Sequence, residues 1–343
     1  MKTFIIAEAG VNHNGSDELA MQLVDIAAEC GADAIKFQTF TAEKLVRPGA
    51  EKAEYQKRET GAGDQFDMLK QLEMSEALHR RLIQHCDAVG IEFMSTPFDE
   101  EAADFLVSLG MKRIKVPSGE ITNHPFLAYL AAKNVPMIIS TGMANLQEVQ
   151  DAVEVVRAER QRLGYQGALD EFVTVLHCTS NYPAAVDDVN LRAMQTIHRE
   201  TGLPVGYSDH TAGALVSIAA VAMGAITIEK HFTVDRNLPG PDHKASLEPG
   251  ELASMICQIR DVERALGSDK KEPMASELPV RALVRRSLTT VRPLSQGQIL
   301  THDDVALLRP GTGIAPKEVP QAIGKTAARD LPAGTTLTWG DLG

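Results

Sequence analysis

The sequence predicts a (β/α)8 barrel followed by a small β-rich domain. Eight short apolar runs of strand length alternate with segments whose apolar residues recur at helical spacing. Such alternation is typical of a parallel sheet covered by helices, and eight units within about 270 residues match a closed barrel. An open, doubly wound sheet is the alternative, although no Gly-x-Gly-x-x-Gly fingerprint follows the first expected strand.

The expected strands share an apolar body and a polar C-terminal end. They span residues 4–9, 34–39, 92–98, 113–120, 136–142, 172–179, 204–211 and 225–233. Ser16 can cap the first helix, which Gly31 ends, and Asp99 can cap the helix after the third strand. The other expected helices cover residues 75–89, 124–133, 145–163, 191–200, 212–224 and 248–266.

Two stretches interrupt this rhythm. Residues 41–73 are polar, charged and too long for an ordinary connection, which predicts an active-site loop with one short helix at 65–72. Residues 268–286 are polar and charged, and we expect a linker there between a barrel domain at 1–267 and a second domain at 287–343. In the second domain short β-like runs are broken by Gly and Pro, and a repeated phrase suggests two related hairpins.

Composition excludes several classes of protein. The net charge of −12 argues against nucleic acid or an anionic membrane as the main partner, so an anionic substrate would need a local cluster of Lys or Arg. The four cysteines form no Cys-x-x-Cys pair, which favours free thiols in a reducing compartment. The first apolar run is too short for a signal peptide, and no run approaches the roughly 18 residues of a membrane span. We therefore expect a cytoplasmic protein.

The last two expected strands end in polar clusters that a core does not need. Ser208, Asp209 and His210 end one strand, and Glu229, Lys230 and His231 end the next. Because parallel neighbours deliver these residues to one end of the sheet, His210 and His231 are candidates for a divalent metal site that acts as a Lewis acid. An acid/base site, or two hydrogen-bonded core histidines, are the alternatives.

Other polar residues fall at the same end of the expected barrel, where active sites lie. Lys36 and Lys115 interrupt apolar strands, and with serines nearby they could hold a phosphate or carboxylate. Ion pairs with Glu8, Glu120 or Glu229, or a Schiff-base lysine, are alternatives. Glu8 and Glu120 are also acid/base candidates. The strand-end set includes Gln38, Thr96, Ser118, Ser140, Ser208 and, in a Gly/Pro-rich loop after the eighth strand, Asp242.

These strand ends strongly resemble the sialic acid synthase family, which makes N-acetylneuraminate and related nonulosonates. The resemblance covers nearly the whole chain and rests on the motifs IAEAGVNHNG, AIKFQTF, MSTPFD, KVPSGEITN, IISTGMA, LHCTSNYP, GYSDHT, IEKHFT, PGPDHKASLEP and RPGTGI. The family has a (β/α)8 barrel followed by an antifreeze-like (SAF) domain. It implies the same two-domain architecture for this chain.

The resemblance implies that phosphoenolpyruvate condenses with an N-acetylated mannose-type aldose and water to give a nine-carbon keto acid and phosphate. It implies a divalent metal, expected to be Mn²⁺, at His210 and His231, and catalytic roles for Glu8 and Glu120. Phosphoenolpyruvate contacts carry over to Lys36, Lys115, Ser118, Ser140 and Ser208, and sugar contacts to Gln38, Tyr182 and Asp242. Thr96 and Ser180 are further substrate-binding candidates. Ser180 stands where some members have Asn. Arg309 matches an arginine that reaches the sugar in the partner subunit, which implies a domain-swapped homodimer.

The acceptor is expected to be N-acetylmannosamine, which would make the chain an N-acetylneuraminate synthase. The alternative within the family is a legionaminate synthase that uses 2,4-diacetamido-2,4,6-trideoxymannose. Alternatives from other classes are a Schiff-base aldolase that uses Lys36 or Lys115, and a carbohydrate-binding protein with an inert barrel.

Overall fold

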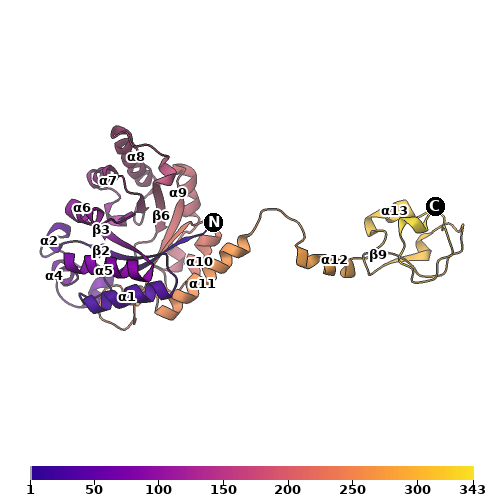
Figure 1. The fold of residues 1–343 in the computed structure, drawn as a ribbon, viewed down its shortest axis with the longest axis horizontal. Helices are drawn as coiled ribbons and strands as arrows, with labels where there is room; N and C mark the ends of the chain where they lie inside the picture. The colour runs from indigo at the N-terminus through magenta and orange to yellow at the C-terminus, as the bar shows by residue number, and fades with distance from the viewer. Residues whose placement is uncertain (1) are drawn as a thin grey trace. The chain divides into compact units, whose positions relative to one another are not determined.

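A computed structural model describes residues 2–343. Contacts divide the chain into two compact units, residues 1–267 and 268–343, each of which is described here by itself (Figure 1). Within the described residues, no helix is long and apolar enough to cross a membrane.

The first unit contains the predicted barrel. Its eight parallel strands run in the order β3-β2-β1-β8-β7-β6-β5-β4, and the end strands β3 and β4 lie next to each other, so the sheet nearly closes. The strands are β1 Phe4–Gly10, β2 Ala34–Thr39, β3 Glu92–Pro97, β4 Ile114–Val116, β5 Met137–Ser140, β6 Val173–Cys178, β7 Val205–Asp209 and β8 Thr227–His231. The predicted fold class is confirmed.

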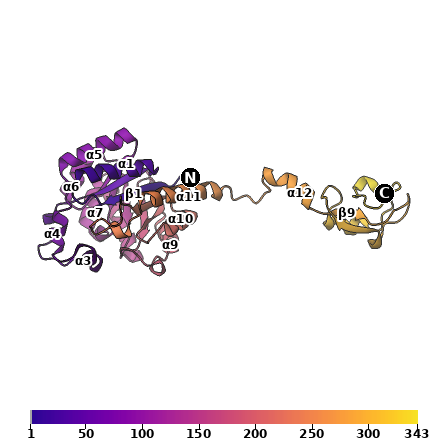
Figure 2. The same ribbon diagram turned by 90° about the horizontal axis from the view of Figure 1, so that it is seen from below.

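Helices surround this sheet (Figure 2). They are α1 Asp17–Glu29, α5 Glu76–Val89, α6 Glu100–Ser108, α7 His124–Ala132, α8 Leu146–Arg162, α9 Ala193–Thr201, α10 Leu215–Ala222 and α11 Pro249–Leu266, with 3₁₀ turns η1 Ser118–Glu120, η2 Leu169–Glu171, η3 Val186–Asp188 and η4 His243–Ala245. The predicted caps form, because Ser16 accepts the Leu19 amide and Asp99 accepts the Ala102 amide.

The inside of the barrel changes character along its axis. Near the N-terminal ends of the strands, the inward positions hold a small apolar cluster made of Ile6, Ala34, Met94, Ile138 and Leu176. Two residues further along β1 and β2, the inward positions are Glu8 and Lys36, which are also buried. Every second residue of a strand faces the inside of the barrel, so the next inward positions after the apolar cluster are these polar groups, near the C-terminal mouth.

The long connection between β2 and α5 is ordered. It contains three short helices, α2 Ala42–Leu45, α3 Glu54–Thr60 and α4 Gln65–Lys70, where the sequence predicted one. Met68 and Leu72 pack against Val11 and Phe40 in a small core of their own. This core forms between residues far apart in the sequence, which is why local propensity did not reveal the other two helices.

The second unit begins inside the stretch expected to be a linker. It contains η5 Ala275–Glu277, α12 Leu278–Val284, β9 Ser287–Thr290, η6 His302–Asp304, β10 Val305–Leu308, η7 Pro316–Glu318, α13 Val319–Ala322 and η8 Trp339–Asp341. The strands β9 and β10 are antiparallel. The two repeated phrases do not form separate hairpins, because Leu294 of one pairs with Leu331 of the other.

Candidate active site

Four charged side chains form a buried cluster across the barrel. Lys36 Nζ lies 2.8 Å from Glu8 Oε2 and 3.6 Å from Glu229 Oε2, and Lys115 Nζ lies 3.3 Å from Glu229 Oε1. All four are at most 4% exposed. Lys36 also donates to Thr96 Oγ1 at 2.9 Å. The two lysines and two carboxylates are thus balanced in charge beneath the mouth of the barrel.

Burial shifts the pKa values of this cluster in different directions. Burial raises the pKa of Glu8 to about 7, although Lys36 opposes the shift. Burial acts on Glu229 too, but Lys115 and Lys36 outweigh it and hold the pKa of that carboxyl below its usual range. Glu8 is therefore the carboxyl that can exchange a proton near neutral pH, while Glu229 stays ionised.

The two predicted imidazoles lie side by side above this cluster. Their ring centroids are 5.6 Å apart. His210 Nδ1 lies 2.7 Å from the Thr179 carbonyl oxygen, so an Nδ1–H donor leaves the lone pair of Nε2 free. His231 Nδ1 is buried, and none of residues 2–343 hydrogen-bonds to it, the Asp242 carboxylate being 3.9 Å away.

These imidazoles fit a metal site that substrate or water must complete. Burial lowers the pKa of His210 to about 4 and that of His231 well below its ordinary value, so both are neutral and can act as ligands. No group of three or more His, Cys, Asp or Glu side chains in the described chain is arranged to hold a metal. His231 Nδ1 is an unpartnered buried atom, and His210 Nε2 makes a 3.4 Å contact with Ser208 Oγ; these two nitrogens could bind a metal whose other positions substrate oxygens would fill.

Small polar groups gather beside the two lysines. The Gly142 amide donates to Ser118 Oγ at 3.0 Å, and Ser118 Oγ lies 3.2 Å from Cys178 Sγ. A Cβ at Gly142 would lie only 2.1 Å from Ser180 Oγ, so Ser180 belongs to the same cradle. Ser140 Oγ is buried and has no hydrogen-bond partner within residues 2–343. Such unoccupied donors beside ammonium groups can bind a phosphate or carboxylate.

Ser208 and Gln38 connect the cluster to its surroundings. Ser208 Oγ donates to Glu229 Oε1 at 2.9 Å and lies 3.4 Å from His210 Nε2. Gln38 Nε2 donates to Glu8 Oε1 at 3.4 Å. Tyr182 covers the imidazoles, with ring centroids 4.2 Å from His210 and 5.6 Å from His231. The predicted sugar contacts therefore border the predicted metal ligands.

Two predicted site residues are described separately, because Glu120 makes none of the contacts above and Arg309 belongs to the second unit. Glu120 is partly exposed on η1, where it accepts from Asn123 Nδ2 at 2.7 Å. Arg309 is exposed in the second unit. Their roles toward substrate, and the domain-swapped dimer that Arg309 suggested, stay predictions.

Asp209 and Lys230 do not face the mouth, although the sequence placed them with the functional clusters. Lys230 Nζ lies 3.1 Å from Asp209 Oδ2, and both side chains are fully buried. Asp209 also accepts from Ser217 Oγ on α10 and from the Thr211 amide. They occupy the outward positions of β7 and β8, so they hold the strand ends to the helix layer.

Sequence reasoning missed the support of the loop that carries Asp242. Asn12 donates to Ser246 Oγ, which in turn donates to the Asp242 carbonyl. His243 lies 3.1 Å from Asn14 Oδ1 and 2.7 Å from Thr233 Oγ1. The polar Asn-His-Asn-Gly run after β1 could have predicted this support, because buried amide side chains need hydrogen-bond partners.

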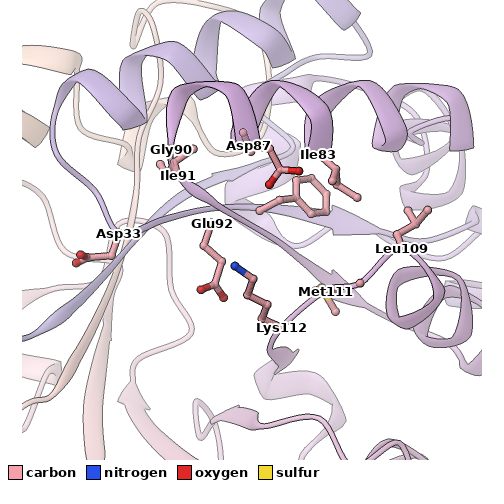
Figure 3. Close-up of a pocket in the computed structure, with 12 residues that line it drawn as sticks. Asp33, Ile83, Asp87, Gly90, Ile91, Glu92, Leu109, Met111 and Lys112 are labelled. Carbon is pink, nitrogen blue, oxygen red and sulfur yellow. The ribbon is translucent and has the colours of Figure 1, made fainter.

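A second hollow lies at the opposite end of the barrel. Figure 3 shows Asp33, Glu92 and Lys112 around it, beside the N-terminal ends of β2, β3 and β4. Asp33 bonds the Ile5 amide and Arg260, and Glu92 pairs with Arg113. Groups at this end of such barrels support stability rather than catalysis.

The chain is similar to known proteins over nearly its whole length. Residues 23–271 match the model of the NeuB family, and residues 285–343 match that of the SAF domain. The chain is 55% identical over 340 residues to the N,N'-diacetyllegionaminic acid synthase of Legionella pneumophila, covering 99% of this chain and 94% of that protein. It is 46% identical over 330 residues to the synthase of the same name from Campylobacter jejuni, covering 96% and 97%. Among solved structures, an N-acetylneuraminic acid synthetase from Leptospira borgpetersenii superimposes with a TM-score of 0.70 at 34% identity, over 82% of this chain and 90% of that one.

Proposed function

Because this chain belongs to the NeuB family and carries a SAF domain, we propose that it condenses phosphoenolpyruvate with an N-acetylated aldose to make a nonulosonic acid. The observation that carries the reaction class is the buried cluster of Lys36, Lys115, Glu8 and Glu229 beneath two neutral imidazoles. A substrate with a phosphate and a carboxylate needs two cations, and an aldehyde acceptor needs an electrophilic activator. Lys36 and Lys115 would supply the cations, and His210 and His231 would hold the activating metal at the same mouth.

The acceptor we propose is 2,4-diacetamido-2,4,6-trideoxymannose, with N,N'-diacetyllegionaminate as product. The relatives named diacetyllegionaminic acid synthases are 55% and 46% identical to this chain, whereas the N-acetylneuraminic acid synthetase is 34% identical. The N-acetylmannosamine expected from the motifs alone is therefore the second candidate.

In the proposed reaction, C3 of phosphoenolpyruvate forms a bond to C1 of the aldose, whose aldehyde oxygen takes up a proton and becomes a hydroxyl. Water adds to C2 and gives up one proton. The resulting tetrahedral centre then loses its hydroxyl proton and expels inorganic phosphate as the bond between C2 and the phosphate oxygen breaks, which leaves the keto group. Lys36 and Lys115, with the hydroxyls of Ser118 and Ser140, hold the phosphate and carboxylate. Glu8 takes a proton from the attacking water, since its pKa of about 7 permits exchange.

His210 and His231 would hold a divalent metal, which when bound polarises the aldehyde carbonyl. The Thr179 carbonyl keeps the His210 ring in one orientation. Tyr182 packs against both rings and would form one wall of the acceptor site. These residues thus orient the acceptor for attack.

A Schiff-base aldolase is less well supported. Lys36 faces two carboxylates, which raise its pKa despite burial and keep it protonated. Burial lowers the pKa of Lys115, so Lys115 would be the nucleophile of that alternative. Trapping of Lys115 by borohydride in the presence of a keto acid would support it, and loss of activity in EDTA would oppose it.

The test is phosphate release from phosphoenolpyruvate with Mn²⁺, run in parallel with both sugars, each with and without EDTA. We expect EDTA-sensitive release, with kcat/KM at least about tenfold higher for the diacetamido sugar, the usual scale for discrimination by one small group. Preference for N-acetylmannosamine would transfer the assignment to N-acetylneuraminate synthesis. Release with neither sugar would refute the synthase function and leave a binding protein as the better explanation.

A further inference from the structure

The long β2–α5 connection reaches the mouth of the barrel through one aromatic side chain. Tyr55, on α3, lies with its ring centroid 5.1 Å from that of Tyr182, at an interplanar angle of 33°. Tyr182 in turn covers His210 and His231. The aromatic surface that begins at the imidazoles therefore continues for one more ring, onto the loop.

Tyr55 is also close enough to Asp242 to be affected by its charge. Burial raises the pKa of Tyr55 well above its usual value, and the carboxylate of Asp242 adds to the shift. The phenol is thus neutral, half-buried and next to two residues of the expected sugar site. Its ring adds an apolar face to a mouth that is otherwise lined by charges and hydroxyls.

The loop holds this ring in place. Gln56 is buried and accepts the Ala53 amide at 3.0 Å, while Thr60 Oγ1 donates to the Gln56 carbonyl at 2.7 Å. Lys52 is only 5% exposed, and its ammonium donates to the carbonyls of Gly61 and Ala62. Thr60 Oγ1, at the end of α3, lies 3.7 Å from Met68 Sδ of α4, and Met68 packs into the small core described above.

We propose that Tyr55 determines acceptor specificity. Together with Tyr182 it forms an apolar wall that favours the diacetamido trideoxy sugar over N-acetylmannosamine. The diacetamido sugar carries an acetamido group in place of the C4 hydroxyl and a methyl in place of the C6 hydroxymethyl, so both changes add apolar surface. Aromatic faces favour such surface and gain nothing from the hydroxyls it replaces. This inference rests on the proposed function.

The test compares three variants at Tyr55 with a control on the same helix. Tyr55→Ala removes the ring, Tyr55→Phe keeps it without the hydroxyl, and Tyr55→Leu keeps apolar volume if the alanine variant folds poorly. Arg58→Ala is the control, because Arg58 is exposed and, within residues 2–343, forms an ion pair only with Glu59. Each purified full-length variant is assayed by phosphate release with both sugars, after thermal unfolding has shown that it is folded.

We expect Tyr55→Ala to raise KM for the diacetamido sugar roughly tenfold, the scale for losing one small apolar contact, and to reduce the preference between the sugars. Its KM for phosphoenolpyruvate should stay within about twofold, since Tyr55 packs on Tyr182 and not on the residues proposed to hold phosphoenolpyruvate. Tyr55→Leu should fall between the alanine variant and the native chain. Tyr55→Phe and Arg58→Ala should behave like the native chain.

Several results would overturn the inference. Tyr55 would not determine acceptor specificity if folded Tyr55→Ala kept the native preference between the two sugars. Tyr55→Leu would serve for this comparison if the alanine variant did not fold. Equal rises in both KM values would show a general effect of the loop. Equal losses in Tyr55→Phe and Tyr55→Ala would assign the effect to the hydroxyl. Failure of the proposed function is distinguishable, because the native chain would then release no phosphate with either sugar, and both conclusions would fall together.

Discussion

Replacing Gly142 by alanine fills the cradle that we assign to the anionic end of phosphoenolpyruvate. The added Cβ would lie 2.1 Å from Ser180 Oγ, 2.8 Å from Ser118 Oγ and 3.0 Å from Cys178 Sγ. The backbone at Gly142 has no left-handed φ, so alanine fits the main chain. The strain must therefore be relieved by the two serine side chains, which can rotate away.

The size of the effect follows from what those rotations remove. A hydrogen bond to a charged group contributes about 1.5–3 kcal/mol, so losing one from the bound anion should lower kcat/KM for phosphoenolpyruvate about 10- to 150-fold. The fold loses less. The Gly142–Ser118 hydrogen bond contributes about 1 kcal/mol, and in a protein of this size Tm should fall by about 2–4 °C.

The assay is the initial rate of phosphate release as phosphoenolpyruvate is varied at saturating sugar. Gly119→Ala is the matched control, because a Cβ there meets nothing within 4 Å, although the residue is adjacent to Ser118. The kcat/KM of the control for phosphoenolpyruvate should stay within about twofold of that of the native chain, as expected of an ordinary surface substitution. If Gly142→Ala keeps kcat/KM within threefold of the control, the cradle does not bind the anion and the reasoning is wrong.

Three further predictions concern other parts of the mouth. His231→Ala should reduce turnover by roughly 1000-fold or more with an unchanged circular dichroism spectrum, since a Lewis acid contributes several kcal/mol, and normal turnover would exclude the metal assignment. In the native chain kcat/KM should rise with pH through a midpoint near 7, because the pKa of Glu8 is about 7 and its ionised form is the base. Glu8→Gln should be slow, and its kcat/KM should not show this rise. An unaltered pH profile in the variant would assign the rise to another group. Lys52→Met should raise KM for the sugar a few-fold, since it frees the loop that carries Tyr55, and should leave KM for phosphoenolpyruvate unchanged; equal changes in both constants would contradict this.

The barrel and most of its mouth could be predicted from local pattern. Each strand is a short apolar run, and the polar residues fall at one end of it. A parallel barrel collects those ends, so Glu8, Lys36 and Lys115 had to approach one another once the fold was assigned. The pairing of the two lysines with Glu229 followed from burial, because an ammonium inside a barrel needs a carboxylate.

Direction and long-range packing could not be read from the sequence. Asp209 and Lys230 lie between the functional residues in the chain but point to the helices, since a strand alternates its faces. Tyr55 lies more than a hundred residues from Tyr182, and nothing local signals that their rings meet. The short helix α12 falls in a polar stretch, where sequence indicated only a linker.

The buried pair of Asp209 and Lys230 fixes the register between β7 and β8, the two strands that lead to His210 and His231. The two residues are register partners across β7 and β8. A slide of one residue would turn Lys230 inward and His231 toward the helices, leaving Asp209 buried alone. A stranded interior charge costs about 3–5 kcal/mol, whereas the matched pair adds little net strength over an apolar pair. The salt bridge thus makes a one-residue slip of these strands unfavourable during folding, and it favours the register in which both imidazoles reach the mouth.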